Sequence, residues 1–85
     1  MYNIEITKHA LKEIISLPTK ISAQIAKAID GFETNPRPKG CKKLKGEKEY
    51  LWRIRVGDYR IIYSIEESIK VIEIRKVSHR KNVYE

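Results

Sequence analysis

Three arginines in the segment LWRIRVGDYRIIYSI, residues 51–65, are the side chains whose type and spacing most plainly suggest chemistry. Arg53 and Arg55 alternate with apolar residues before a glycine–aspartate dipeptide, and Arg60 follows that dipeptide. A guanidinium is a permanent cation whose fork of donors matches the oxygens of a phosphate. If the three arginines converge, they predict a binding site for a phosphate or another anion.

The pattern of this segment predicts a β-hairpin in which the arginines do converge. Gly57-Asp58 suits a two-residue type II′ turn, which favours glycine at its first position. The turn sets the pairs Val56–Tyr59, Arg55–Arg60, Ile54–Ile61, Arg53–Ile62 and Trp52–Tyr63. Directly paired residues share a face of a sheet. One face would then carry the three arginines and Ile62. The other face, expected to pack on helices, would carry Trp52, Ile54, Val56, Tyr59, Ile61 and Tyr63.

Two other interpretations of the arginines stay open at this point. Like charges opposite each other destabilise a sheet, so Arg55 facing Arg60 is a cost that folding alone does not explain. Arginine pairs can nevertheless stack or be bridged by a carboxylate such as Glu73, and a slipped register would separate them. The anion site is the preferred interpretation.

The C-terminal segment VSHRKNVYE offers further candidate groups. His79 could act as a general acid or base at neutral pH, although a hydrogen-bonding surface role is commoner for a lone histidine. Tyr84 is either functional or an unstructured penultimate residue. Cys41 has no evident partner and is interpreted as incidental. Because no zinc-ligand spacing, P-loop or Cys–His pair is present, we expect no metal site and no cofactor.

Positive charge is concentrated in the second half of the chain. The net charge is +7, yet residues 1–36 are balanced, with four basic and four acidic side chains. Residues 37–60 hold nine basic side chains against three acidic ones. This distribution favours a polyanionic partner, nucleic acid or an acidic protein, over a merely soluble basic surface. The candidate RNA-binding lysines are Lys42, Lys43, Lys45, Lys48 and Lys81.

Length and composition predict one soluble domain that spans residues 1–85 and has a thin core. A single cysteine excludes an internal disulfide, and the N-terminal MYNIEITKHA has no apolar run typical of a secretory signal. No apolar stretch approaches the ~20 residues of a membrane span. We therefore expect a cytoplasmic protein without membrane association.

The periodicity predicts the order β-α-α-β-β-β. The expected elements are a strand at 2–6, a helix capped by Thr7 and ending near Leu17, a helix from Pro18 to Asn35-Pro36, a basic loop at 36–49 with Leu44 as a short anchor, and strands at 50–56, 59–65 and roughly 69–77. Helices followed by a meander predict an α+β fold, with a helical hairpin packed on a largely antiparallel four-stranded sheet.

The register of the last strand does not follow from its pattern. Ile69, Val71, Glu73, Arg75 and Val77 would lie on one side, and Lys70, Ile72, Ile74 and Lys76 on the other. Both sides mix apolar and charged residues. The strand is therefore interpreted as a central one with both faces covered.

The runs KKLKGEKEYLWRIRVGDYRIIYSI and KVSHRKNVY resemble the RelE/ParE toxin superfamily of type II toxin–antitoxin systems. The resemblance extends over essentially the whole chain, and LKG, RIRVGDYRIIY and HRKNVY together are specific for the superfamily. It implies a RelE-like, microbial RNase-like fold. RelE-type members are mRNA interferases, metal-free endoribonucleases that cut mRNA in the ribosomal A site. The resemblance therefore implies inhibition of translation, with mRNA, the ribosome and a cognate RelB-like antitoxin as partners.

The resemblance also implies a catalytic set. Its members are Arg53, Arg55, Arg60, Arg80 and Tyr84, with His79 as a further candidate. Attack of a 2′-hydroxyl on the adjacent phosphorus gives a dianionic transition state, which placed cations stabilise. Arg60 and Arg80 would hold the phosphate, and Tyr84 would be the general base. The best-known members carry lysine at the positions of Arg53 and Arg55. Because arginine is a poor proton donor, either Arg55 or His79 remains the candidate general acid.

Two alternative functions remain. ParE-type members share the fold but inhibit DNA gyrase by binding it, without nuclease chemistry. A third possibility is a member without catalytic activity, whose arginines only pair with an acidic antitoxin segment. The joint presence of Arg60, Arg80 and Tyr84 favours the nuclease. In each case we expect an antitoxin that neutralises the arginines or displaces the segment of Tyr84.

Overall fold

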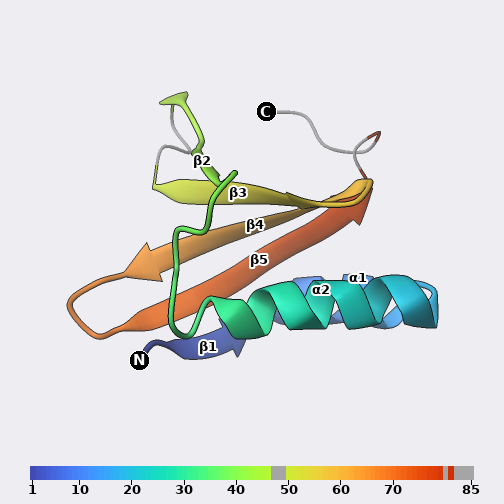
Figure 1. Cartoon of the computed structure of the whole chain (residues 1–85), viewed down its shortest axis with the longest axis horizontal. Coiled ribbons are helices and arrows are strands. Elements are labelled where there is room, and N and C mark those ends of the chain that lie inside the picture. Colours follow the sequence, from blue (N-terminus) through green and yellow to red (C-terminus); the bar gives the residue numbers. More distant parts are fainter. Residues whose placement is uncertain (47–49, 80, 82–85) are drawn as a thin grey trace.

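The computed structural model describes residues 1–46, 50–79 and 81, and shows a helical layer packed on one face of a sheet (Figure 1). Its helices are α1 (Lys8–Ile15) and α2 (Thr19–Gly31); its strands are β1 (Asn3–Ile6), β2 (Lys42–Lys43), β3 (Leu51–Val56), β4 (Tyr59–Glu66) and β5 (Val71–His79). The sheet order is β1-β5-β4-β3-β2, with β1 parallel to β5 and the other pairs antiparallel. The predicted α+β class is confirmed.

Local capping explains where the helices begin. The Thr7 hydroxyl accepts a hydrogen bond from the Ala10 amide at 3.1 Å, as predicted for the cap of α1. Pro18 is the N-cap of α2, so this helix begins one residue later than expected. Both helices also end earlier than predicted, α1 at Ile15 and α2 at Gly31. Their C-terminal ends continue as tighter turns, in which for example the Phe32 amide donates to the Ile29 carbonyl oxygen.

The core lies between the helices and the sheet. It contains Ala10, Ile25, Ile29, Phe32, Ile61, Tyr63, Ile72, Ile74 and Val77. The predicted helix-facing residues Trp52, Ile54, Val56 and Tyr59 pack against this cluster. The rings of Phe32 and Tyr63 stack with centroids 4.3 Å apart, and the Tyr63 hydroxyl donates to the Pro36 carbonyl oxygen at 2.8 Å. This bond attaches the start of the basic loop to the centre of the sheet.

The β3–β4 hairpin has the predicted register. All five predicted pairs are present, including Arg55 with Arg60 and Arg53 with Ile62. Gly57 has φ +60°, and Lys70 is the one described non-glycine residue with positive φ. Positive φ at the first central residue and not at the second is the pattern of a type II′ turn.

The predicted loop at 36–49 contains a strand that the sequence did not suggest. Lys42 pairs with Arg53 and Lys43 with Trp52, so the sheet has five strands rather than four. A strand of two lysines has neither alternation nor β-propensity to reveal it. Leu44 follows as the predicted anchor and is buried, in a small cluster with Leu51 and Ile62.

A β-bulge in β5 corrects the predicted sides of that strand. Ile62 pairs with Lys76 while Tyr63 pairs with Ile74, which leaves Arg75 as an extra residue. Val77 therefore joins Ile74 in the core, and Lys76 lies on the opposite face, beside Ile62. The sequence placed both on the wrong sides because a strict period of two cannot register the extra residue. The strand does lie centrally, between β1 and β4.

Candidate functional site

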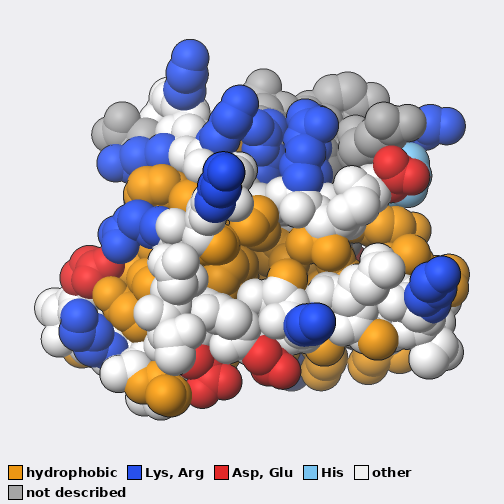
Figure 2. All heavy atoms as spheres, viewed as in Figure 1, with side chains coloured by type: hydrophobic (Ala, Val, Ile, Leu, Met, Phe, Trp, Pro, Cys, Tyr) orange, Lys and Arg blue, Asp and Glu red, His pale blue; other side chains and the backbone are white. Residues whose placement is uncertain are grey.

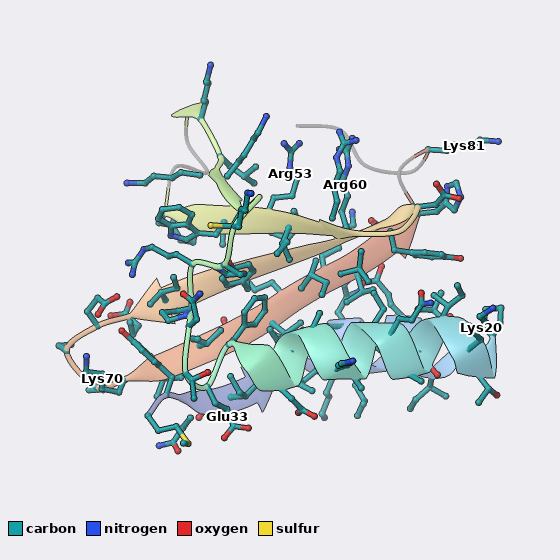
Figure 3. All side chains as sticks on the ribbon, in the orientation of Figure 1. Lys20, Glu33, Arg53, Arg60, Lys70 and Lys81 are labelled. Atoms are coloured by element: carbon teal, nitrogen blue, oxygen red, sulfur yellow. The ribbon has the colours of Figure 1, made fainter. Side chains whose placement is uncertain are left out.

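Arg53, Arg55 and Arg60 lie on the face of the sheet that is turned away from the helices, here called the arginine face. Figure 3 shows Arg53 and Arg60 projecting from β3 and β4 on this side. Arg55 is exposed and directly paired with Arg60, which is half-buried, as is Arg53. The apolar cluster of Leu44, Leu51 and Ile62 lies on the same face. Apolar surroundings strengthen the attraction between these cations and an anion.

The geometry tests two of the alternative interpretations of the arginine pair, the slipped register and the bridge by Glu73. The observed register excludes a slip, because Arg55 does face Arg60. Glu73 does not bridge them: its Oε1 lies 3.0 Å from Nε of Arg75, the bulged residue of the same strand. Arg75 in turn lies over the ring of Tyr50. The Glu73 carboxylate therefore forms its ion pair with Arg75 and not with Arg55 or Arg60.

A hollow of about 470 Å³ adjoins the arginine face where β2 leaves β3. We call it the β3 notch, and its lining residues are Lys39, Gly40, Lys42, Arg53, Ile54 and Arg55. Lys42 pairs with Arg53 and so shares the arginine face. Among the residues that the structure describes, no carboxylate lies within 4.0 Å of the charged atoms of Lys39, Lys42 or Arg55. These three side chains therefore bring uncompensated positive charge to the notch.

The other predicted lysines lie elsewhere. Lys43 pairs with Trp52, so its side chain points to the opposite face from Lys42. Lys45 is exposed beyond β2, and Lys81 points away from the labelled arginines, beyond the end of the sheet (Figure 3). The predicted residues Arg80, Tyr84 and Lys48 lie outside the described residues.

His79 lies at the end of β5 on the helix-facing side of the sheet. It pairs with Tyr59, and the two rings meet edge to face with centroids 5.2 Å apart. Its Nδ1 accepts a hydrogen bond from the Lys81 amide at 3.2 Å, so the neutral ring carries its proton on Nε2. Tyr59 and His79 also line a hollow of about 240 Å³, and Glu13 of α1 lines it with them. The ring thus lies on the other side of the sheet from the arginines, and its role as a general acid stays a prediction.

Sequence reasoning did not select three residues at or beside the arginine face. Lys76 lies opposite Ile62, and Ser78, which is buried, lies opposite Arg60. Lys76 and Ser78 could not be assigned to this face from the sequence, because the bulge reverses which residues of β5 share a face with the hairpin arginines. Lys39 belongs to the basic loop, whose charge was the available signal.

The charge of the whole molecule follows the same division. Figure 2 shows Lys and Arg side chains gathered over β2 and β3, on the side remote from the helices. In residues 1–46, 50–79 and 81, no group of three or more His, Cys, Asp or Glu side chains could hold a metal ion, and no helix is long and apolar enough to cross a membrane. The chemistry that this arrangement supports is binding of a polyanion and stabilisation of charge developing on it.

Comparison with known proteins gives one consistent result. Residues 4–84 match the family described as the ParE toxin of type II toxin–antitoxin system, parDE. The chain is 33% identical to the toxin RelE of Mycobacterium tuberculosis, over 98% of this chain and 86% of the other. It is 35% identical to the toxin RelE3 of Methanocaldococcus jannaschii, over 92% and 90%. Among solved structures, the archaeal RelE–RelB complex from Pyrococcus horikoshii OT3 matches with a TM-score of 0.83 and 35% identity, over 96% of this chain and 98% of the other.

Proposed function

Because the chain belongs to the RelE/ParE family of toxins of type II toxin–antitoxin systems, we propose that it is an endoribonuclease that cleaves mRNA on the ribosome. The observation that carries the proposal is the direct pairing of Arg55 with Arg60, beside Arg53, on the sheet face turned away from the helices. A chain of 85 residues has little stability to spare, so a repulsive pair in its sheet indicates a function that requires it.

The proposed reaction needs no group beyond the RNA, the side chains and solvent water. A general base removes the proton of a 2′-hydroxyl, the O2′–P bond forms, and the P–O5′ bond breaks as the 5′-oxygen gains a proton. The products are a 2′,3′-cyclic phosphate and a 5′-hydroxyl. Arg60 binds the non-bridging oxygens, whose charge rises in the transition state. Arg80 and Tyr84 are the proposed second phosphate ligand and general base.

The leaving 5′-oxygen is assigned to Arg55, supported by Arg53. Both lie on the arginine face, whereas His79 lies on the other side of the sheet. A guanidinium donates hydrogen bonds strongly but gives up its proton poorly, so Arg55 stabilises the negative charge on the leaving oxygen, and the proton that this oxygen gains comes from solvent water, which the protonated general base replenishes. Such a site gains most when its substrate is held in place, which supports cleavage on the ribosome.

Induction of the protein in cells, followed by primer extension across translated messages, tests the nuclease. We expect cuts inside codons, and cleavage reduced by about 10²–10³-fold in Arg60→Ala, the range for loss of one transition-state donor. Arg55→Ala should also reduce it. Lys20→Ala is the matched control, because it removes an exposed cation from α2 and should leave cleavage unchanged. Thermal melting of each variant separates loss of chemistry from loss of fold.

Two outcomes would overturn this proposal. Growth arrest with DNA breaks and intact messages would favour the ParE-type alternative, inhibition of gyrase, to which the family description also gives weight. Cleavage that persists on RNA with a 2′-deoxy group at the cut position would exclude attack by the 2′-hydroxyl.

We also propose a RelB-like antitoxin as the partner. The support is the P. horikoshii structure, which is that of a RelE–RelB complex, together with the uncompensated charge of Lys39, Lys42 and Arg55 at the β3 notch. An antitoxin segment with acidic residues would neutralise the arginine face or displace the segment of Tyr84. A structure of the complex in which the arginine face stays open and Tyr84 keeps its position would contradict this.

A further inference from the structure

The β3 notch has features of a second anion site, separate from the position that Arg60 would give the scissile phosphate. Three consecutive β3 residues, Arg53, Ile54 and Arg55, line it. Successive side chains point to opposite faces of a strand, so a hollow that touches all three lies along the strand's edge. This edge is open there because β2 pairs only with Trp52 and Arg53.

The backbone of the strand contributes a donor to this edge. The Leu44 amide donates to the Leu51 carbonyl oxygen at 2.9 Å, so the Leu51 peptide groups point toward β2. In an antiparallel ladder this direction alternates, and Arg53 and Arg55 therefore point their peptide groups the same way. At Arg55 the strand β2 has ended, and no backbone carbonyl in the described part of the chain accepts from its amide. Its N–H is directed toward the notch.

The opposite wall of the notch supplies flexible cationic side chains. Lys39 and Lys42 are exposed and lie on either side of the turn at Gly40, whose φ is +94°, just before the chain pairs with β3. No atom outside its immediate neighbours would lie within 4 Å of a Cβ at Gly40, so the mouth of the hollow is open there. Lysine and arginine side chains combined with a backbone N–H are the donors that phosphate groups of nucleic acids bind.

From these observations we propose that the β3 notch binds a second backbone phosphate of the RNA, with Lys39 and Lys42 as its principal ligands. The inference rests on the proposed function in taking RNA as the polyanion. The notch and β4, which carries Arg60, lie on either side of β3, so the two sites are separated by about two interstrand spacings, ~10 Å. That separation is longer than one nucleotide step of an extended strand and shorter than two, so the second phosphate would be a near neighbour of the scissile one. The notch would then set the direction in which RNA crosses the sheet.

The test uses the purified chain and an RNA oligonucleotide that is 2′-deoxy at the cut position, so that binding is measured without cleavage. We expect the Lys39→Ala/Lys42→Ala variant to bind several-fold more weakly than the parent. Its slope of log affinity against log salt should fall by about 0.7, the value for one lost phosphate contact in a single strand. The matched control, Lys20→Ala/Lys27→Ala, removes two exposed cations from α2 and should change neither quantity.

A double-mutant cycle, in which the lysines and one RNA phosphate are neutralised separately and together, tests whether the lysines bind that phosphate. A methylphosphonate placed at one flanking position should weaken binding to the parent protein but not further weaken binding to the Lys39→Ala/Lys42→Ala variant. Such non-additivity shows that the lysines and that phosphate act together. Additive effects at every flanking position would overturn the proposal. So would unchanged oligonucleotide binding combined with loss of binding to a glutamate-rich peptide, which would assign the notch to an acidic protein segment.

Failure of the notch and failure of the nuclease are distinguishable. If cleavage requires Arg60 but the effects in the cycle are additive, the second phosphate site is wrong and the nuclease proposal stands. If the effects in the cycle are non-additive but no RNA is cleaved, the β3 notch binds RNA and the protein is not a nuclease.

Discussion

At the scale of single residues, Tyr63 shows how the core supports the site. Its ring stacks on Phe32 under the middle of the sheet, and its hydroxyl donates to the Pro36 carbonyl oxygen at the start of the basic loop. Burial, with a smaller contribution from the Cys41 thiol, raises the pKa of Tyr63 well above its ordinary value of 10.0. The loop that carries Lys39 and Lys42 is thus attached through a group that must stay protonated.

Replacement of Tyr63 by phenylalanine should destabilise the protein without altering the core shape. The Pro36 carbonyl would lose its buried partner, which costs about 1–3 kcal/mol in the free energy of unfolding, measured by urea denaturation at pH 7. Because the folded pKa is raised, parent stability should fall as pH rises above the unfolded value near 10. The variant has no group to titrate there, so its stability should fall less steeply. Tyr59→Phe, at a half-buried position, is the control. Equal alkaline slopes for parent and Tyr63→Phe would contradict the assignment.

At the scale of elements, local signals in the sequence predicted the hairpin but not the strand beside it. Gly57-Asp58 determines the β3–β4 register by turn chemistry alone, and alternation then assigns each arginine to a face. The bulge at Arg75 has no such signal, because it shifts the pairing of β5 with β4 in mid-strand, away from the turn that joins them. The two lysines of β2 pair only because the loop returns beside β3. Tertiary context, not propensity, forms both features.

The edge of β5 depends on a side chain from a helix. Beyond Ile74, where the pairing with β1 ends, the Glu13 carboxylate of α1 accepts a hydrogen bond from the Val77 amide at 2.7 Å. The Thr7 amide also donates to the Ile74 carbonyl oxygen. The residue that caps α1 and a carboxylate from later in the same helix thus replace the missing strand and hold the part of β5 that carries Ser78 and His79.

Loss of the Glu13 carboxylate should therefore loosen the end of β5. In Glu13→Ala the half-buried Val77 amide loses its partner, and we expect a cost of about 1–3 kcal/mol in unfolding free energy. Hydrogen exchange at the Val77 amide, followed by NMR, should accelerate more than exchange at Ile61 in β4. Glu13→Gln keeps an acceptor oxygen and should restore much of the protection. Lys12→Ala, at an exposed neighbouring position, should have no effect. Uniform acceleration across the sheet would show instead a global loss of stability.

At the scale of the whole molecule, the two faces of the sheet differ in the side chains that they carry. The helix-facing side holds the core, while the other side combines a small apolar cluster with the arginines. The shared face of Arg53, Arg55 and Arg60 was predictable from the hairpin because these residues are near neighbours in sequence. The β3 notch was not, because it forms only where the loop carrying Lys39 passes the edge of β3. The proposed role of the arginine face implies that the protein is less stable than its fold allows.

The repulsion between Arg55 and Arg60 allows a direct measurement of that cost. In Arg55→Thr an exposed cation is replaced by a residue that favours strands, and the new side chain would face Arg60 without like-charge repulsion. We expect the free energy of unfolding to rise by about 0.2–1 kcal/mol, the range for cross-strand pairs. The gain should shrink as salt rises from about 0.01 to about 1 M, over which the Debye length falls from about 30 to about 3 Å. RNA binding by the same variant should weaken, because a stability gain at a functional site is commonly accompanied by loss of function. Lys20→Thr on α2 removes an equal charge without a facing cation, and should give neither the salt-dependent gain nor the loss of binding. If Arg55→Thr lowered stability at every salt concentration, the arginine pair would be structural, and the strongest support for an anion site on this face would be lost.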